Sequence, residues 1–225
     1  MNIKVLSLLL IVIIAGFAAC KATGDIAPVL TTTNLNIVNA DTNALNFYQN
    51  GSRLNQISSL APSSESGYIT VSLPPTPTIY QFKIAGSSNY LINGYELTLD
   101  TFKYHSLFAA GETADKVFLV TDVAPASGTV TQAAIRFVNA SPATTGLTVS
   151  FNGGPTFANQ AFKSASGFTL IGSGIVTYNV YQSGSSTPIL SGTTTLQPST
   201  IYTFFTRGIP GGSKQNALSA AVVVN

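Results

Sequence analysis

The most constraining feature of this 225-residue chain is an internal repeat, in which the second half restates the first at an offset of about 100 residues. LNIVNA at 35–40 recurs as IRFVNA at 135–140, and IYQFKIAGSS at 79–88 recurs as TYNVYQSGSS at 177–186. Because such ordered matches at a nearly constant offset are hard to obtain by chance, the sequence predicts a tandem duplication. The predicted boundaries are 34–123 for copy one, 124–132 for a linker rich in small residues, and 133–225 for copy two.

The residue pattern within each copy is typical of β-structure. No window shows a sustained apolar stripe at helical spacing. Short runs rich in Val, Ile, Thr, Tyr and Phe instead alternate with Gly, Ser, Pro and Asn, which favour turns. About seven strands per copy favour an all-β chain of two tandem immunoglobulin- or fibronectin-like β-sandwiches.

One motif in copy two sharpens the sandwich prediction. The run from Leu196 to Tyr202 (LQPSTIY) resembles the L-x-P-x-T-x-Y motif of the tyrosine corner in fibronectin-type sandwiches, where the Tyr hydroxyl bonds to backbone a few residues upstream. In copy one, the run from Leu99 to Tyr104 is one residue shorter and lacks the Pro. We therefore expect a corner at Tyr202 and a weaker one at Tyr104, and the alternative is that both are ordinary core residues of strands.

Two short segments resemble a known family. The first is RFVNASP, from Arg136 to Pro142, which is followed by a short strand and Asn-Gly; the second is the strand end Val120-Thr121-Asp122 before a Pro- and Gly-containing linker. Together they resemble domain of unknown function 4397, an exported family found in lipoproteins of Bacteroidetes. Copy one departs from the motif at Asp41 and Thr42, where Ser-Pro is expected. The resemblance implies an envelope location and brings no catalytic residues.

The N-terminus predicts export and lipid attachment. Residues 5–19 form an apolar run that is shorter than the roughly 20 residues a spanning helix needs. The run ends in Phe17-Ala18-Ala19 directly before Cys20, which resembles a bacterial lipobox with Phe in place of the usual Leu. We expect a signal peptide at 1–19, a lipidated (palmitate-bearing) Cys20, and a tether at 20–33. The alternatives are an ordinary signal peptide and an uncleaved anchor.

The residue after the cysteine bears on the membrane that is reached. Lys21 follows Cys20, whereas an Asp there would favour retention in the inner membrane. We therefore expect a lipid-anchored protein of the outer membrane, with the periplasmic and the external face both open.

Composition excludes several functional classes. Only 8% of the residues are charged and the net charge is +2, so the chain has no basic field of the kind that binds nucleic acid. A single Cys excludes an intrachain disulfide and a thiolate metal cluster, and a single His excludes a multi-histidine metal site. We expect no cofactor, no metal and no nucleic-acid partner.

The remaining candidates for chemistry are few. His105 has its counterpart near Thr203, so no histidine site is duplicated, and we interpret it as structural. Glu112 and Asp115 share one loop and are either a weak Ca²⁺ site or solvated turn charges. A glycosidase pair of carboxylates from distant strands stays open on spacing alone.

Aromatic side chains raise the question of sugar binding. Four tyrosines are candidates for an exposed stacking face, although Trp, the strongest platform, is absent. They are Tyr48, Tyr68, Tyr90 and Tyr95. We expect a non-catalytic cell-envelope lipoprotein with a binding or structural role, held to the membrane by its lipid. The main alternative is a carbohydrate-binding accessory surface protein; a hydrolase is the other.

Overall fold

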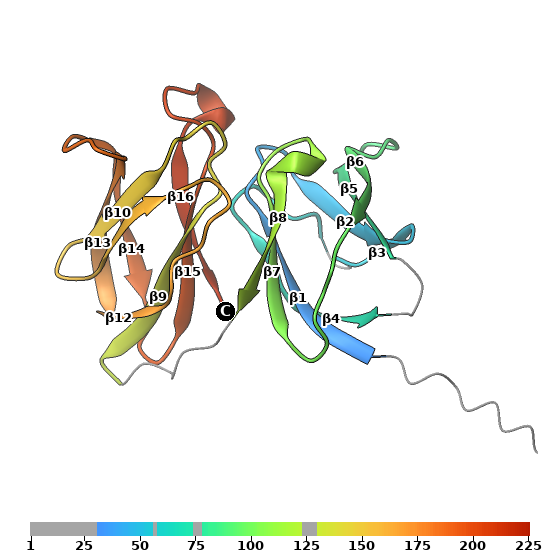
Figure 1. Ribbon diagram of the computed structural model, residues 1–225, viewed down its shortest axis with the longest axis horizontal. Coiled ribbons are helices and arrows are strands. Elements are labelled where there is room, and N and C mark those ends of the chain that lie inside the picture. Colours follow the sequence, from blue (N-terminus) through green and yellow to red (C-terminus); the bar gives the residue numbers. More distant parts are fainter. Residues whose placement is uncertain (1–30, 56–57, 74–77, 123–129) are drawn as a thin grey trace, which may run out of the picture. The chain divides into compact units, whose positions relative to one another are not determined.

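Both copies are β-sandwiches in the computed structural model, which describes residues 31–55, 58–73, 78–122 and 130–225. Residues 31–225 form one compact unit. Each copy contains two four-stranded sheets, and Figure 1 shows them with copy one in blue to green and copy two in yellow to red. The predicted all-β class with two tandem sandwich domains is confirmed.

Copy one pairs its strands as follows. One sheet has the order β4 (Glu65–Leu73), β1 (Thr31–Asn39), β7 (Tyr104–Ala109) and β8 (Val117–Asp122). The other has the order β3 (Ser52–Arg53), β2 (Leu45–Gln49), β5 (Ile79–Ile84) and β6 (Ile92–Glu96). A 3₁₀ turn, η1 (Ala114–Lys116), precedes β8.

Copy two repeats this plan. One sheet has the order β12 (Thr169–Gly172), β9 (Gln132–Asn139), β15 (Ile201–Arg207) and β16 (Ser219–Val224). The other has the order β11 (Thr156–Gln160), β10 (Leu147–Phe151), β13 (Gly174–Gln182) and β14 (Pro188–Leu196). A second 3₁₀ turn, η2 (Lys214–Asn216), precedes β16.

The first strand of each copy lies inside its sheet. β1 pairs in parallel with β7, with Leu35 opposite His105, and β9 pairs in parallel with β15, with Ile135 opposite Tyr202. The immunoglobulin order ABED instead has its first strand at a sheet edge. β1 and β9 are therefore central strands. Each runs from one end of its sandwich to the loops at the other end.

The central strands are buried on both faces. Leu35 and Ile37 pack into the core of copy one, whereas Val38 on the opposite face packs into a cluster that draws residues from both copies. A strand that is covered on both faces has no reason to alternate apolar and polar residues. This explains why IVNA and FVNA read as continuous apolar runs.

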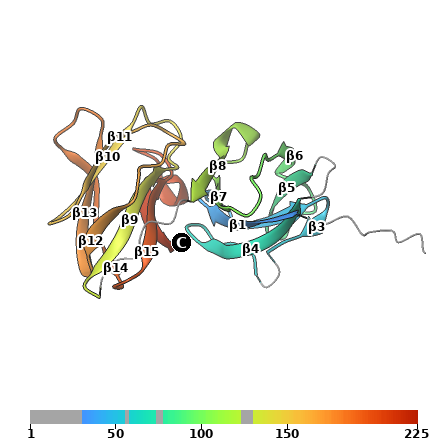
Figure 2. The ribbon, with the colours of Figure 1, turned by 60° about the horizontal axis from the view of Figure 1, so that its bottom comes forward.

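The cluster between the copies is a third hydrophobic core, which we call the shared core. It is built from the outward faces of β1, β7 and β8 in copy one and of β9, β15 and β16 in copy two (Figure 2). Phe108 stacks on Phe118 at 5.1 Å between ring centroids and meets Phe205 of copy two edge-on at 5.8 Å. The buried members of the shared core are Val38, Ala40, Phe108, Ala110, Phe118, Val138, Ala140, Phe205 and Val223.

The repeated V-N-A motif has a structural cause. The Asn39 amide nitrogen donates to the carbonyl oxygen of Leu60 at 2.8 Å, and its oxygen accepts from the Asp41 backbone at 2.9 Å. Asn139 repeats both contacts, with the carbonyl of Gln160 at 2.9 Å and the backbone of Ser141 at 3.0 Å. Each Asn therefore closes the turn after the central strand and holds the returning loop.

The two predicted tyrosine corners have different outcomes. The Tyr202 hydroxyl accepts a hydrogen bond from the Gln197 backbone at 2.9 Å, which is the contact of a tyrosine corner. Tyr104 is 50% exposed and meets Tyr68 edge-on, so the predicted copy-one corner is wrong. The parallel registers place His105 at the position of Tyr202, with Nε2 3.4 Å from the Asp100 carbonyl oxygen, also five residues upstream.

This register also corrects the predicted counterpart of His105. Thr203 lies opposite Arg136, so its equivalent in copy one is Ser106, which lies opposite Asn36. The sequence comparison matched the two tyrosines because each follows a similar turn, and this shifted the register by one residue. A shift of one residue turns a side chain to the opposite face of a sheet.

Several predicted boundaries fall outside the described residues. These include the signal peptide, Cys20, most of the tether and most of the 124–132 linker. At the edges of the described segments, β1 begins at Thr31 and takes in the last three residues assigned to the tether, while β9 begins at Gln132. Among the described residues no helix is long and apolar enough to cross a membrane.

Candidate functional site

A buried ion pair links the two copies. Arg136 of β9 contacts the carboxylate of Asp122, the last residue of β8, and the side chains are 3% and 5% exposed. Arg136 Nε also donates to Thr203 Oγ1 at 2.8 Å, and its guanidinium lies 4.7 Å from the centre of the Phe168 ring. A desolvated pair of this kind is stable only while both charges are present.

The second carboxylate oxygen of Asp122 is satisfied as well. It accepts hydrogen bonds from the Tyr68 hydroxyl at 2.7 Å and from Ser106 Oγ at 2.8 Å. The Asn225 side-chain amide donates to the same Tyr68 hydroxyl at 3.0 Å, so Tyr68 joins copy one to the end of copy two. Burial raises the pKa of Tyr68, and the nearby Asp122 charge adds to this, so its side chain stays a neutral phenol at physiological pH.

The duplication is visible in this network and is broken at one point. Ser106 Oγ donates to Asp122 at 2.8 Å, and the equivalent Thr203 Oγ1 donates to Asn225 at 2.5 Å. One copy therefore ends in a carboxylate where the other ends in an amide. The base that pairs with the carboxylate, Arg136, is supplied by copy two. This asymmetry favours pairing of copy one with copy two over pairing of like copies.

A second arginine crosses between the copies. Arg207, the last residue of β15, donates from Nε to Ser63 Oγ at 2.7 Å and from Nη1 to the Asp41 carbonyl at 3.1 Å. Burial lowers the pKa of Arg207, and the Asp41 carboxylate opposes that effect. Here too copy two supplies the base.

Glu65 is another carboxylate in the interface. Its Oε1 accepts from the Val224 backbone at 2.9 Å, and its Oε2 accepts from the Asn36 amide at 2.5 Å. Burial raises the pKa of Glu65, and the two hydrogen bonds partly offset this rise. The bond to Val224 also satisfies a backbone donor in the edge strand β16.

Three hollows accompany these contacts, and the first is a small apolar cleft of about 280 Å³ between the copies. Its lining consists of three pairs of residues, each pair occupying matching positions of the duplication. The pairs are Tyr68 with Phe168, Tyr104 with Ile201, and Asp122 with Asn225. The side chains of Tyr68, Asp122 and Asn225 are bonded to one another, and the cleft offers mainly apolar surface.

The second hollow, of about 640 Å³, lies at the opposite end of the interface. The loops after β1 and β9 and the loops before β8 and β16 converge on it. Thr42, Glu112 and Thr113 line it from copy one, and Pro142 and Asn216 line it from copy two. Small apolar residues share this lining with polar side chains, and loops of this kind are common sites of recognition.

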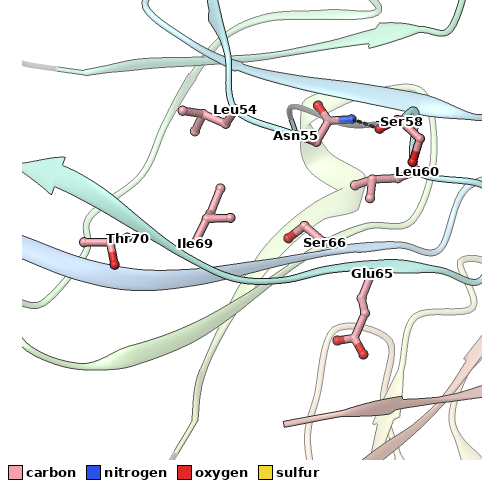
Figure 3. Close-up of a pocket in the computed structure, with 8 residues that line it drawn as sticks. All are labelled: Leu54, Asn55, Ser58, Leu60, Glu65, Ser66, Ile69 and Thr70. Carbon is pink, nitrogen blue, oxygen red and sulfur yellow. Dashed lines mark hydrogen bonds between the residues drawn. The ribbon is translucent and has the colours of Figure 1, made fainter.

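The third hollow belongs to copy one alone and is shown in Figure 3. It has a volume of about 570 Å³ and lies between the 54–60 loop and the edge strand β4. Leu54, Leu60 and Ile69 line it, and the Glu65 carboxylate points away from the other labelled side chains. Asn55 takes the place of strand pairing here, because its Oδ1 accepts from the Phe47 backbone at 2.8 Å.

The sequence candidates for catalysis and metal binding each make contacts of their own. His105 is 1% exposed, with Thr121 Oγ1 3.4 Å from its Nδ1. Glu112 accepts from Asn43 Nδ2 at 3.1 Å, and the Asp115 side chain bonds with Thr113, which lowers the Asp115 pKa. Within the described segments, no group of three His, Cys, Asp or Glu side chains could hold a metal ion.

The four candidate tyrosines separate into two kinds. Tyr68 is held by Asp122, and the Tyr95 hydroxyl donates to the Val117 carbonyl at 3.1 Å. Tyr48 and Tyr90 instead meet edge-on at 6.0 Å, with the Lys83 ammonium 5.2 and 4.3 Å from their ring centres. Of the four candidates, these two form an aromatic pair with each other, next to a cation.

The sequence does not predict the interface charges. Arg136 and Asp122 lie in the two short family motifs, which assign them no role. The sequence does contain a signal. Only 8% of the residues are charged, yet Arg136 lies within an apolar strand and Asp122 ends one. Such a charge needs a buried partner.

The comparisons with known proteins agree with the duplicated architecture. A family model described as domain of unknown function (DUF4397) matches the chain twice, at residues 33–150 and at residues 133–225. In the comparison with curated proteins, no sequence matches significantly.

Proposed function

Because the chain belongs to the DUF4397 family, we propose that it is a non-catalytic lipoprotein of the cell envelope whose joined sandwiches present a binding surface on their loops. In this proposal the chain is of the Bacteroidetes lipoprotein type, is cleaved before Cys20, and is anchored by lipid to the outer membrane. Two or more acyl chains give stable anchoring.

The convergence of loops from both copies at one end of the interface carries this proposal. β1 begins at Thr31, directly after the segment that leads to Cys20, and ends at Asn39, next to the 640 Å³ hollow. Nine residues of strand cover roughly 30 Å. We call the end where β1 begins the tethered end and the other the loop end. An anchor at the first therefore leaves the loop end free to meet a partner.

The buried charges support a non-catalytic role. Asp122, Arg136 and Arg207 bond to residues of the other copy, and so does Glu65. Their chemistry is used to fix the interface. A shared core with such contacts joins the two sandwiches in one compact unit, as a presenting scaffold requires.

Anchoring is tested by detergent partitioning of the full chain and of Cys20→Ser. We expect the wild type to enter the detergent phase without residues 1–19 and the variant to lose that partitioning. A Cys20→Ser protein that still partitions with membranes and keeps residues 1–19 contradicts lipid attachment.

The binding role is tested by crosslinking in the native host with a photoreactive residue in place of Thr42 at the loop end. A matched control carries it at Thr156, an exposed strand position away from the hollow. We expect one discrete crosslinked partner from position 42 and none from position 156. The same products from both positions contradict the proposal.

A second candidate is capture of carbohydrate, and the Tyr48–Tyr90 pair with Lys83 is the observation that favours it. Aromatic faces next to a cation suit stacking on a sugar ring that carries acidic groups. A glycan array with residues 20–225 tests this, and Tyr90→Ala is the matching variant. Binding that Tyr90→Ala abolishes supports the candidate; an array without any signal contradicts it.

A further inference from the structure

Exposed apolar side chains gather at the tethered end. Of the eight large hydrophobic residues that are exposed in the described part of the chain, seven lie there. Phe102 and Ile175 are each 79% exposed, and Val130 is 84% exposed. Single exposed hydrophobic residues are ordinary, but their concentration at one end of a molecule marks a contact surface. The seven are Ile79, Phe102, Tyr104, Val130, Leu170, Ile175 and Val224.

The strand registers place these residues at the same end of their sheets. The Phe102 backbone donates to the Thr32 carbonyl at 3.0 Å, at the start of β1. Val130 lies two residues before β9, Ile175 is the second residue of β13, and Val224 ends β16. The bond of Asn225 to Tyr68 brings the corresponding ends of the two copies together. Leu170 of β12 lies opposite Ala134, near the start of β9. The remaining exposed residue, Ile189, lies near the start of β14, at the loop end.

Phe102 is unusual in its backbone as well as in its exposure. Its φ is 58°, a left-handed conformation that is unfavourable for a bulky residue. The matching position in copy two has φ 56° and is occupied by Ser199. The two positions correspond because the Ser199 backbone donates to the Gln132 carbonyl as that of Phe102 does to Thr32. Copy one thus has an exposed aromatic ring at a strained position where copy two has a small polar residue. This difference points to a functional role for Phe102 that folding does not require.

The surroundings of Phe102 favour a lipid surface as its partner. Asp100 and Lys103 on either side form an exposed ion pair at 2.9 Å, so the loop carries no net charge. The chain that precedes the described residues enters at this same end, at Thr31. Residues 20–30 reach at most about 40 Å when fully extended, which keeps the tethered end close to lipid attached at Cys20.

We propose that the tethered end, which includes Phe102, is a membrane-docking surface that inserts apolar side chains into the interface of the bilayer. This inference rests on the proposed anchoring at Cys20, which supplies the first membrane signal and leaves docking as the second. Docking holds the tandem upright and directs the loop end away from the lipid.

A tryptophan reporter tests docking apart from anchoring. The chain contains no Trp, so Phe102→Trp gives a single emitting residue. It is placed in residues 20–225 carrying Cys20→Ser, a chain that keeps every described strand and all three cores but has no lipid. Vesicles of phosphatidylcholine, and of phosphatidylethanolamine with phosphatidylglycerol, are the probes. Ile189→Trp, 38% exposed and remote from the tethered end, is the matched control.

We expect emission from Trp at position 102 to shift to the blue with both kinds of vesicle and emission from position 189 to stay unchanged. In sedimentation, replacing Phe102 by Ser and Ile175 by Thr together should lower vesicle partitioning about tenfold or more, since each loses the burial of a large apolar side chain. Equal shifts at both positions, or no shift at 102, overturn the proposal. A blue shift without vesicles that grows with protein concentration assigns the surface to a second copy of the chain and overturns it too.

Loss of docking is distinguishable from loss of anchoring. Suppose that the chain without lipid binds vesicles, but the full-length Cys20→Ser protein still enters the detergent phase with residues 1–19 retained. This result contradicts the proposed anchoring and leaves docking in place. A lipidated chain whose Phe102→Trp emission stays unshifted in vesicles contradicts docking alone.

Discussion

Removing the charge of Asp122 should destabilise the whole tandem. Asp122→Asn leaves the Arg136 guanidinium 3% exposed, with the Thr203 hydroxyl and the Phe168 ring as its remaining contacts. The new amide also presents donor hydrogens to a site where Tyr68 already donates. Breaking a buried pair by removing one partner costs about 3–5 kcal/mol.

This loss is large enough to measure by thermal unfolding. For a unit of about 200 residues, 1 kcal/mol shifts the Tm by roughly 2–4 °C, so we expect Asp122→Asn to lower the Tm by about 10 °C. The double variant Arg136→Leu with Asp122→Asn removes both charges. Its loss should be smaller than the sum of the two single losses by about 2 kcal/mol, because neighbours in one network do not act additively.

The matched control is the exposed pair of Asp100 and Lys103. Asp100→Asn should leave the Tm unchanged, since solvent screens such pairs. All variants are compared by calorimetry in the chain beginning at residue 20 with Cys20→Ser. An Asp122→Asn protein as stable as the control, or strict additivity in the double variant, would refute the role assigned to the buried pair.

Three further variants test the fold. Tyr202→Phe should cost about 1 kcal/mol in urea unfolding through the lost bond to Gln197, and Tyr104→Phe almost nothing; equal losses would remove the corner argument. Phe108→Ala should cost about 3–5 kcal/mol because it opens a cavity in the shared core, and a loss under about 1 kcal/mol would mean that the cluster is not packed in solution. Burial raises the Glu65 pKa, so its ionisation opposes folding: the stability of the wild type relative to Glu65→Gln should fall as pH rises through the raised pKa, and a rise would reverse the sign we infer.

The sequence was sufficient for the class of fold because the repeat and the turn pattern are local signals. Tyr202 could be predicted from seven consecutive residues that end at the tyrosine itself. The sequence could not predict that His105, and not Tyr104, lies at the position equivalent to Tyr202, because this depends on the register of β7 against β1. Residues 70 apart in the chain set this register, and no local pattern records it.

The interface was beyond the sequence for a related reason. The apolar run that ends in VNA is repeated in both copies, yet burial on the second face of each strand comes from the other copy and not from its own sandwich. Arg136 is 14 residues from Asp122 in sequence, across the predicted linker, and the sequence of either copy alone does not predict the ion pair between them. The sequence does show an asymmetry that indicates pairing, since copy one supplies the acidic Asp122 and copy two the basic Arg136.

The central claim is that the shared core makes the two sandwiches one unit, and cutting the chain between them tests it most directly. A protease site placed within residues 124–132 allows the backbone to be cut in the folded protein. We predict that the two halves then elute together at the size of the uncut chain and unfold in one calorimetric transition. Halves that separate on the column and unfold independently would contradict the claim.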